Sequence, residues 1–520
     1  MGLLVLMAGW YRFGSESSAS GGRYVEGIVG LPSRPTPLFA RANPVDADLA
    51  ALLFSGLTRI TGDGTPTPDL AERWDVTPDG LAYTFILRPD LVWHDGRPLT
   101  AQDVAFTVSA VQSPGFQGSS SLAARWTGIT VLTPDERTVV FRLPAPSAAF
   151  LALAALGIVP RHLLNGLGPA ELIEAHATRT TIGNGPFRLM RMDPTGARLE
   201  PNPIYHLGTP GLEAIELRFY PDDASLIRAL ARREIDGALL SARPSSEALG
   251  AVVARPQLHA TPLVEASYTV LYVNNQREPL FEPALRRALA ASIDRTALIA
   301  EDDSALPGDG PIVPGSWAYA PGGWATRAQA EALFIAAGWR RVASGPLQRD
   351  GKILRLELLT NDDPQRVTLA EAIAAQLRGF GVEATVRALS PSELLGRHVN
   401  NREYDLLLFG WQADVDPDPY GGWHTSQIAS GGRNVAGFHD LEADRLLEQA
   451  RLTLDTAERK DLYMRWQARY ADLAPSVVLH YSRRLYVQPR NLTGGSASVL
   501  FEPASRFTGV HEWHIAREKR

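Results

Sequence analysis

The most informative stretch of the sequence is residues 70–111, which read LAERWDVTPDGLAYTFILRPDLVWHDGRPLTAQDVAFTVSAV. In the middle of this segment Tyr83, Phe85 and Leu87 occupy every second position, so a strand there would bury one face. Asp-Gly dipeptides on either side of this run predict turns, because glycine adopts positive φ at no steric cost. The segment therefore predicts a compact β-turn-β-turn-α unit.

A helix is expected after the second turn. Thr100 stands where an N-cap belongs, and Asp103 can reach back to the backbone of the cap, as in a capping box. Val104 and Val108 then fall on one helical face, which we expect to be buried. His94 lies next to an aspartate in the preceding turn, and we interpret it as a structural histidine rather than a ligand.

The composition limits the classes of protein to consider. A chain of 520 residues exceeds what one core normally holds, so two or three domains are expected. Hydrophobic residues at 45% and charged residues at 21% are ordinary for a soluble globular protein. The net charge of −6, without a dense Lys/Arg patch, argues against nucleic acid as a partner. The absence of cysteine excludes disulfides, thiolate metal sites, a thiol nucleophile and a lipidated cysteine.

The N-terminal segment has an unusual pattern. Residues 2–10 are apolar but fall well short of the ~20 residues that span a bilayer. Arg12 follows this run, whereas a signal peptide carries its positive charge in front. Residues 14–22 are rich in Ser and Gly, as in a flexible linker. We expect residues 1–22 to be the remnant of a membrane anchor and its linker; a disordered cytoplasmic N-terminus is the alternative.

Two further regions read as α/β units. The first predicts a strand, a helix and a strand at 215–219, 224–232 and 235–240. The second predicts strands and helices in the order β-α-β-α-β at 354–359, 365–378, 382–388, 392–399 and 404–409. That order implies a mostly parallel sheet with right-handed crossovers.

The strand at 404–409 leads directly into the loop GWQADVDPDPYGGW, residues 410–423. Open α/β sheets bind ligands outside the carboxyl ends of their strands, so this loop is expected to face a cleft. Its side chains combine aromatic rings with a few charges, as small-molecule sites do. The candidate ligand-binding residues are Trp411, Ala413, Asp414, Asp416, Tyr420 and Trp423.

The loop also admits other interpretations. Its aspartates have the spacing of a calcium-binding loop. Pro419 replaces the glycine at the sixth position and Thr425 the glutamate at the twelfth, so the loop does not match an EF-hand. Alternate residues on one loop do not face each other across a sugar, which disfavours a glycosidase pair. Trp411 is either a core residue or part of the wall of the ligand site. Asp416, which precedes a proline, is expected to form a turn. Nucleophile-elbow, Walker, dinucleotide and zincin motifs are absent, and we interpret residues 511–514, HEWH, as a tail rather than a metal site.

These segments together resemble a family of binding proteins. The fixed points of residues 70–111, from Leu70 to Phe106, are similar to a motif of the extracellular solute-binding proteins of ABC importers for peptides, nickel and related solutes. This is the oligopeptide/dipeptide-binding group (family 5, cluster C). TIGNGPFRL at 181–189 and LRRALAASIDRTALI at 285–299 resemble further family segments, the first with Asn184 in place of threonine. The matches extend from about residue 50 to about residue 450.

The resemblance implies an α/β fold of the periplasmic-binding-protein-like type II, with two lobes joined by a hinge. It is the three-domain variant of peptide-binding members. Domain I would comprise 23–57, 178–263 and 488–520, with domain II inserted at 58–177 and domain III at 264–487. The hinge would lie where the chain crosses between lobes, near 262–265 and 487–491.

The resemblance also implies binding without catalysis, and no cofactor or metal. Asp414 matches the carboxylate that pairs with the α-ammonium of bound peptides, so we expect a short peptide as the solute. An oligosaccharide or a metal chelate on the same scaffold is the alternative; a hydrolase acting in the cleft and a sensory receptor are alternatives from other classes. The expected partners are an ABC permease and its ATPase, and the protein is expected to be an extracytoplasmic monomer tethered at its N-terminus.

Overall fold

The computed structural model describes residues 21–178, 182–240, 254–300, 304–429, 431–495 and 497–516, together with positions 250, 252 and 302. The predicted anchor remnant lies almost entirely outside these residues. Within the part of the chain that the structure describes, none of the helices combines the length and apolar character needed to cross a bilayer.

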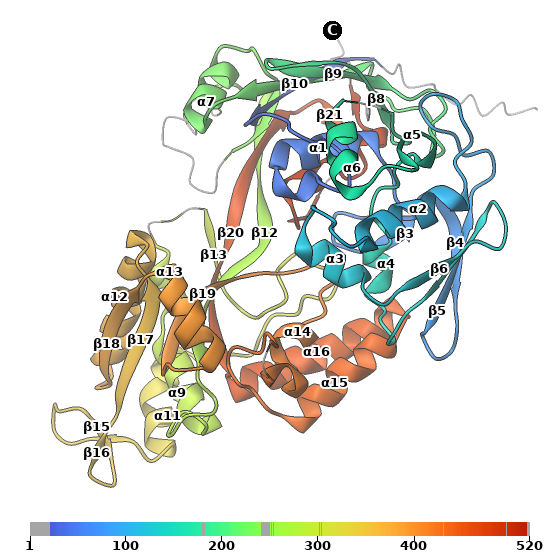
Figure 1. Cartoon of the computed structure of the whole chain (residues 1–520). Helices are drawn as coiled ribbons and strands as arrows, with labels where there is room; N and C mark the ends of the chain where they lie inside the picture. The colour runs from blue at the N-terminus through green and yellow to red at the C-terminus, as the bar shows by residue number, and fades with distance from the viewer. Residues whose placement is uncertain are drawn as a thin grey trace, which may run out of the picture.

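One mixed sheet runs through both lobes of the molecule (Figure 1). Among the described residues its strands follow in the order β18 (Glu383–Leu389), β17 (Arg355–Asn361), β19 (Leu406–Gln412), β12 (Leu258–Val273), β20 (Ser476–Pro489), β11 (Gly237–Leu239), β1 (Arg23–Val29), β10 (Ala214–Tyr220), β9 (Gly196–Pro201) and β8 (Phe187–Asp193). Two short strands, β13 (Ala305–Pro307) and β22 (Val499–Leu500), join its middle.

The second lobe contains the predicted β-α-β-α-β unit. Strands β17, β18 and β19 are parallel, and α12 (Pro364–Gly379) crosses between the first two. The helix predicted at 392–399 forms as α13 (Pro391–Glu393) and a π-helical turn, η3 (Leu394–Val399). The parallel prediction is confirmed for these three strands. The sheet as a whole is mixed, because antiparallel β12 and β20 continue it into the other lobe.

The first lobe holds the other end of the sheet. Strand β1 pairs in parallel with β10 and β11, and α7 (Asp223–Ala231) connects these two strands, which confirms the first predicted α/β unit. Strands β9 and β8 extend this end in antiparallel fashion. Its core combines residues from three parts of the chain, namely Tyr24 near the N-terminus, Phe187 and Leu217 in the middle, and Trp513 near the C-terminus.

Strands β12 and β20 are the connection between the lobes. Residues 258–264 of β12 pair with 483–489 of β20 on the first-lobe side, whereas residues 267–273 pair with β19 in the second lobe. The β12–β20 register shifts between Val264 and Tyr268, opposite residues 481–483 of β20. A shift of this kind is a local bend in an otherwise continuous ladder. It lies next to the first crossing predicted at 262–265.

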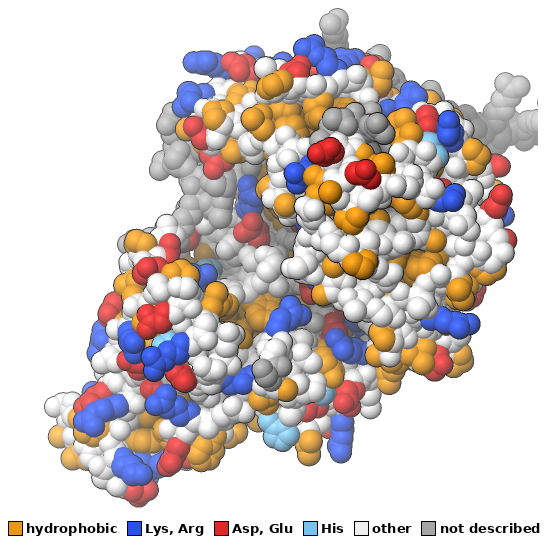
Figure 2. Space-filling view, viewed as in Figure 1, with side chains coloured by type: hydrophobic (Ala, Val, Ile, Leu, Met, Phe, Trp, Pro, Cys, Tyr) orange, Lys and Arg blue, Asp and Glu red, His pale blue; other side chains and the backbone are white. Residues whose placement is uncertain are grey.

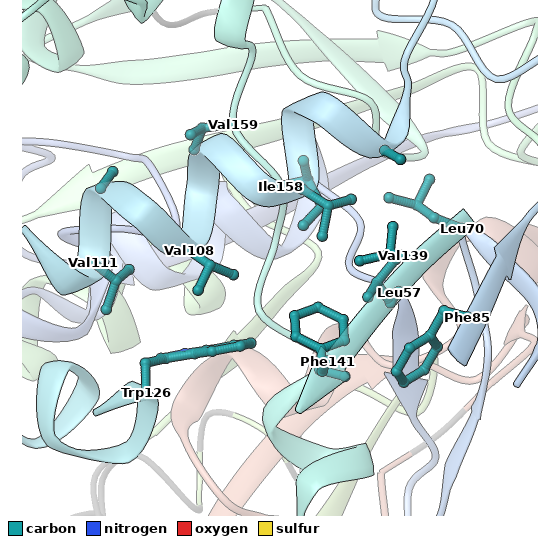
Figure 3. Packing of buried hydrophobic residues seen from close by; sticks show 14 of the residues in the cluster. Leu57, Leu70, Phe85, Val108, Val111, Trp126, Val139, Phe141, Ile158 and Val159 are labelled. Atoms are coloured by element: carbon teal, nitrogen blue, oxygen red, sulfur yellow. The ribbon is translucent and has the colours of Figure 1, made fainter. Parts of the chain in front are cut away.

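The segment 70–111 belongs to an insertion that has its own sheet. This four-stranded antiparallel sheet has the order β4 (Ala71–Val76), β5 (Ala82–Leu87), β7 (Thr138–Arg142) and β6 (Thr130–Leu132). Its helices are α2 (Ala101–Gln112), α3 (Ser120–Trp126), α4 (Phe150–Leu153), α5 (Arg161–Leu164) and α6 (Pro169–Thr178). Figure 3 shows Val108 and Val111 of α2 packed with Trp126, Phe141 and Phe85 in the core of this unit. The predicted strand, capping box and buried valine face are confirmed.

His94 joins two of the sequence motifs. Its Nδ1 accepts the N–H of Gly183 and its Nε2 lies 3.1 Å from the carbonyl oxygen of Gly185. Burial lowers the pKa of His94 to about 4, so the ring is neutral and both of its nitrogens are used. The interpretation as a structural histidine is confirmed. Asn184 completes the junction, because its Oδ1 accepts the N–H of Ser55 at 2.8 Å.

The remaining elements surround these sheets. The other helices are α1 (Pro44–Leu53), α9 (Pro283–Ser292), α10 (Arg295–Leu298), α11 (Ala330–Ala336), α14 (Tyr420–Trp423), α15 (Leu441–Leu452) and α16 (Thr456–Leu473), with short turns η1 (Ala40–Ala42), η2 (Arg327–Gln329), η4 (Thr425–Ile428), η5 (Pro503–Phe507) and η6 (Val510–Glu512). The minor strands are β2 (Thr58–Ile60), β3 (Pro66–Pro68), β14 (Arg340–Arg341), β15 (Leu347–Arg349), β16 (Lys352–Ile353), β21 (Leu492–Thr493) and β23 (His514–Ile515).

Candidate functional site

A cavity of about 620 Å³ lies where the first lobe, the insertion and the second lobe meet. The first lobe contributes Tyr205 and His511, the insertion contributes Arg125, and the second lobe contributes Asp414 and Arg433. The space-filling view shows a recess between the upper lobe and the lower left part of the molecule (Figure 2). The volume falls within the ~300–1,000 Å³ of typical ligand sites.

The loop 410–423 reaches this cavity from the end of β19, as the sequence predicts. Its first turn is fixed to β12 by two hydrogen bonds to the carbonyl oxygen of Ala266, one from the N–H of Ala413 at 2.7 Å and one from Nε2 of Gln412 at 2.8 Å. Ala266 lies within the register shift of β12. The loop is therefore anchored at the bend between the lobes.

Asp414 is the loop carboxylate that points away from its own lobe. Its side chain is 46% exposed and pairs with the guanidinium of Arg125, which lies in α3 of the insertion and is 35% exposed. Both residues line the cavity. The ion pair therefore joins the two sides of the cavity.

Asp416 is held inside the second lobe. Both of its carboxylate oxygens accept hydrogen bonds from Arg459 of α16 at 2.7 Å, and the two side chains are only 8% and 6% exposed. Oδ1 of Asp416 also accepts the N–H of Asp418 at 3.1 Å, a turn-forming contact of the kind expected before a proline. Asp416 borders the cavity, but its hydrogen-bonding capacity is used by its own lobe.

Asp418 is neutralised in the same way. Its Oδ2 accepts Nε of Arg451 in α15 at 2.7 Å, and its Oδ1 accepts the N–H of Tyr420 at 3.0 Å. Burial raises the pKa of Asp418, and Arg451 opposes this shift. Because each of the three loop aspartates is paired with an arginine, the loop offers no cluster for a cation. Over the described residues, no group of three metal-ligating side chains occurs.

The three loop aromatics are not among the residues that line the cavity itself, and Tyr420 borders neither the cavity nor the small hollow next to it. Trp423 is buried in the second-lobe core, where its ring meets Tyr470 edge-on at 4.9 Å. Tyr420 stacks on His424 with ring centroids 4.0 Å apart. Trp411 packs partly against the core and also borders a small hollow next to the main cavity, with the Arg433 guanidinium 5.6 Å from its ring centroid. Trp411 therefore contributes to both the core and the site.

Two further arginines near the loop were not singled out from the sequence. Arg433 lines the cavity, and among the described residues its guanidinium makes no hydrogen bond or ion pair. Nη1 of Arg366 is buried without a partner in the described chain, and burial lowers the pKa of this group. Nη2 of Arg366 is 2.8 Å from where a Cβ at Gly410 would stand. The position of Arg366 directly after the carboxyl end of β17 was a usable signal; Arg433 had none.

The first-lobe wall contains the segment predicted to be a tail. His511 lines the cavity and meets Tyr205 edge-on at 5.6 Å, and burial lowers the pKa of His511. Trp513 is buried in the first-lobe core and donates to the carbonyl oxygen of Gly495 at 2.8 Å. The prediction of a tail is wrong, because Trp513 packs into the core and brings His511 to the cavity wall.

Comparisons with known proteins agree with this geometry. The model of the bacterial extracellular solute-binding proteins, family 5 Middle, matches residues 65–433. The oligopeptide-binding protein AppA of Bacillus subtilis is 26% identical over 514 residues, covering 96% of this chain and 92% of that protein. The di/tripeptide-binding protein 2 of Pseudomonas aeruginosa is 28% identical over 488 residues, covering 88% and 87%.

Solved structures share the fold. AppA of Bacillus subtilis in complex with a nonapeptide superimposes with a TM-score of 0.64 at 26% identity, covering 96% of this chain and all of that one. NikZ of Campylobacter jejuni in complex with Ni(L-His) gives 0.65 at 26% identity, covering 95% and 99%. HbpA2 of Haemophilus parasuis gives 0.81 at 20% identity, covering 95% and 100%, and shows the fold alone. The predicted periplasmic-binding-protein-like fold is confirmed.

Proposed function

We propose that this chain, which belongs to the bacterial extracellular solute-binding proteins of family 5, captures short peptides between its lobes for a membrane permease and its ATPase. The observation that carries the proposal is the distribution of charge at the cavity. Asp414 presents a carboxylate to the cavity, while Arg433, which lines the same cavity, makes no ion pair in the described chain. A peptide supplies the complement, a cation at one end and an anion at the other.

Asp414 is assigned to the peptide ammonium. Asp416 and Asp418 are already paired with arginines of their own lobe, so Asp414 is the loop aspartate free to exchange its partner. An ammonium at this position makes charge-assisted hydrogen bonds in a partly desolvated site. Trp411 and Ala413 line the small hollow beside it, whereas Asp416 and Trp423 hold the loop in place and Tyr420 stacks on His424.

Arg433 is assigned to the peptide carboxylate. It is exposed at the cavity wall beside Trp411 and makes no ion pair in the described chain, so a ligand carboxylate could form a charge-assisted pair with it. Arg366 lies beside Gly410, behind the residues that line the cavity. The relatives named for binding oligopeptides and di- or tripeptides support this class of ligand.

Capture would proceed by closure of the lobes. We place the hinge at the register shift of β12 between Val264 and Tyr268 and at the facing residues 481–483, which keeps the first crossing predicted near 262–265 and moves the second a few residues before the predicted 487–491. Because the loop is hydrogen-bonded to Ala266 within that shift, closure and ligand contact are coupled. We further propose that a monomer acts outside the cytoplasm, tethered through residues 1–22.

A binding cycle tests the ammonium assignment. The tripeptide Ala-Ala-Ala and its N-acetylated form are titrated by calorimetry into the protein and into Asp414→Ala. We expect the substitution to weaken binding of the free peptide about 30-fold, for a cost of ~2 kcal/mol. N-acetylation of the peptide should lower its affinity for the unmodified protein by the same factor. The two losses of binding free energy should not add, because both changes remove the same ion pair.

The control is Asp461→Ala, which removes an exposed carboxylate of α16 that does not line the cavity. It should leave both affinities unchanged. Fully additive losses, or an unchanged affinity in Asp414→Ala, would show that Asp414 is not the partner of the amine.

A further inference from the structure

Arg125 occupies the position that the proposed function assigns to the ligand ammonium. Its guanidinium pairs with Asp414 across the cavity, in the last turn of α3. Helix α3 is fixed by Leu122 and Trp126, which are buried in the core of the insertion. Figure 3 shows Trp126 in this core. Arg125 is therefore held at the cavity wall by the packing of its helix.

A peptide ammonium that pairs with Asp414 must displace Arg125 from it. The other carboxylates of the cavity wall in the described chain already have partners. Asp69 lies 2.6 Å from Nε2 of His206, Asp416 is held by Arg459, Asp418 is held by Arg451, and the exposed Glu502 accepts a backbone N–H as the cap of η5. Arg125 would then face the cavity as an unpaired cation next to the bound amino terminus.

We propose that Arg125 is a specificity-determining residue that selects peptides with an acidic first residue. This inference rests on the proposed function. The ammonium and side-chain carboxylate of an N-terminal Glu are separated by a few bonds, and they would meet Asp414 and Arg125, which stand side by side. Binding then exchanges one protein ion pair for two protein–ligand ion pairs. With a neutral first residue, the peptide ammonium pairs with Asp414 and leaves Arg125 without a partner.

The geometry also predicts an opposite effect on neutral peptides. Without the guanidinium, the carboxylate of Asp414 is free before the ligand arrives, so a neutral peptide no longer has to break an ion pair. Arg125→Gln should therefore weaken binding of an acidic peptide and strengthen binding of its neutral counterpart. A residue that only keeps the cleft in shape would change both affinities in the same direction.

The test is a cycle with the tripeptides Glu-Ala-Ala and Gln-Ala-Ala, titrated into the protein and into Arg125→Gln. The unmodified protein should prefer Glu-Ala-Ala by about five-fold, the size of one partly exposed charge pair. Arg125→Gln should abolish that preference and bind Gln-Ala-Ala more tightly than the unmodified protein does. Arg142→Gln, which removes an exposed arginine of β7 in the same insertion, is the matched control and should keep the preference.

The outcomes separate this inference from the proposed function. Equal affinity for the two peptides in the unmodified protein, or a preference that survives Arg125→Gln in a variant with unchanged circular dichroism, overturns the role of Arg125 and leaves peptide capture standing. Absence of binding of either peptide to any of the three proteins refutes peptide capture, and the role of Arg125 falls with it.

Discussion

Asp416→Ala should destabilise the second lobe severely while changing peptide affinity little. The substitution removes both acceptors at 2.7 Å from a guanidinium that is 6% exposed. Arg459 keeps its hydrogen bonds to the carbonyl oxygen of Ala450 at 2.9 Å and to the hydroxyl of Tyr463 at 2.8 Å, but it loses the carboxylate that is hydrogen-bonded to it. Breaking a buried pair in this way typically costs about 3–5 kcal/mol.

Urea unfolding followed by tryptophan fluorescence measures this cost. With a urea dependence of about 3 kcal/mol per molar, the transition should move down by about 1 M or more. Removing both charges in Asp416→Leu/Arg459→Met should recover part of the loss, because it is the unpaired charge that is costly. The control is Asp472→Ala, which breaks an exposed pair with Arg287 and should cost under about 1 kcal/mol.

Two results would refute this reasoning. The first is a midpoint for Asp416→Ala that matches that of Asp472→Ala, since the buried pair would then contribute no more than a surface pair. The second is a double variant that is less stable than Asp416→Ala, because the loss would then come from packing rather than from charge.

Three further predictions concern other parts of the chain. A Cβ at Gly183 would overlap the carbonyl oxygen of Leu53, so Gly183→Ala should lower the free energy of unfolding by about 3 kcal/mol. A Cβ at Gly379 meets nothing, so the control Gly379→Ala should be neutral or stabilising by up to ~1 kcal/mol. Comparable melting temperatures of the two variants would contradict this. The pKa of His94 is lowered to about 4 from 6.5, so the stability that its neutral form contributes is complete above pH 6.5. It is lost as the pH falls towards 4, by up to about 3 kcal/mol. His94→Gln should flatten the loss of stability between these pH values, and an unchanged pH profile would count against this prediction. Deleting residues 1–20 should leave the melting temperature unchanged, as the apolar start and Ser/Gly run predict for a tether, and a large drop would show that they pack against a lobe.

The local structure was largely predictable because it follows from short-range patterns of apolar and turn-forming residues. Alternating apolar residues at 83–87 gave β5, and the order of apolar runs from 354 to 409 gave three parallel strands and the helices between them. The direction of β19 also gave the position of the loop, because chain direction in a parallel sheet decides which edge binds ligands. His94 was correctly interpreted from its neighbours in a turn.

Long-range pairing was not predictable in the same way. Arg125 and Asp414 are 289 positions apart in the sequence, and neither has a local pattern that names the other. The partners of Asp416 and Asp418 lie in α16 and α15, so the sequence could not show that two loop charges are neutralised. The C-terminal segment was misread because a short run such as HEWH lacks periodicity, although Trp513 is a core residue.

The most direct test of peptide capture is a competition measured by native mass spectrometry. The protein is incubated with equal amounts of Glu-Ala-Ala, a nickel–histidine chelate and a neutral oligosaccharide, and the mass of the bound species is read from the intact complex. Peptide capture predicts one adduct with the mass of the tripeptide, strongly reduced in Asp414→Ala. An adduct with the mass of the chelate or of the sugar, or no peptide adduct while the protein remains folded, would contradict it.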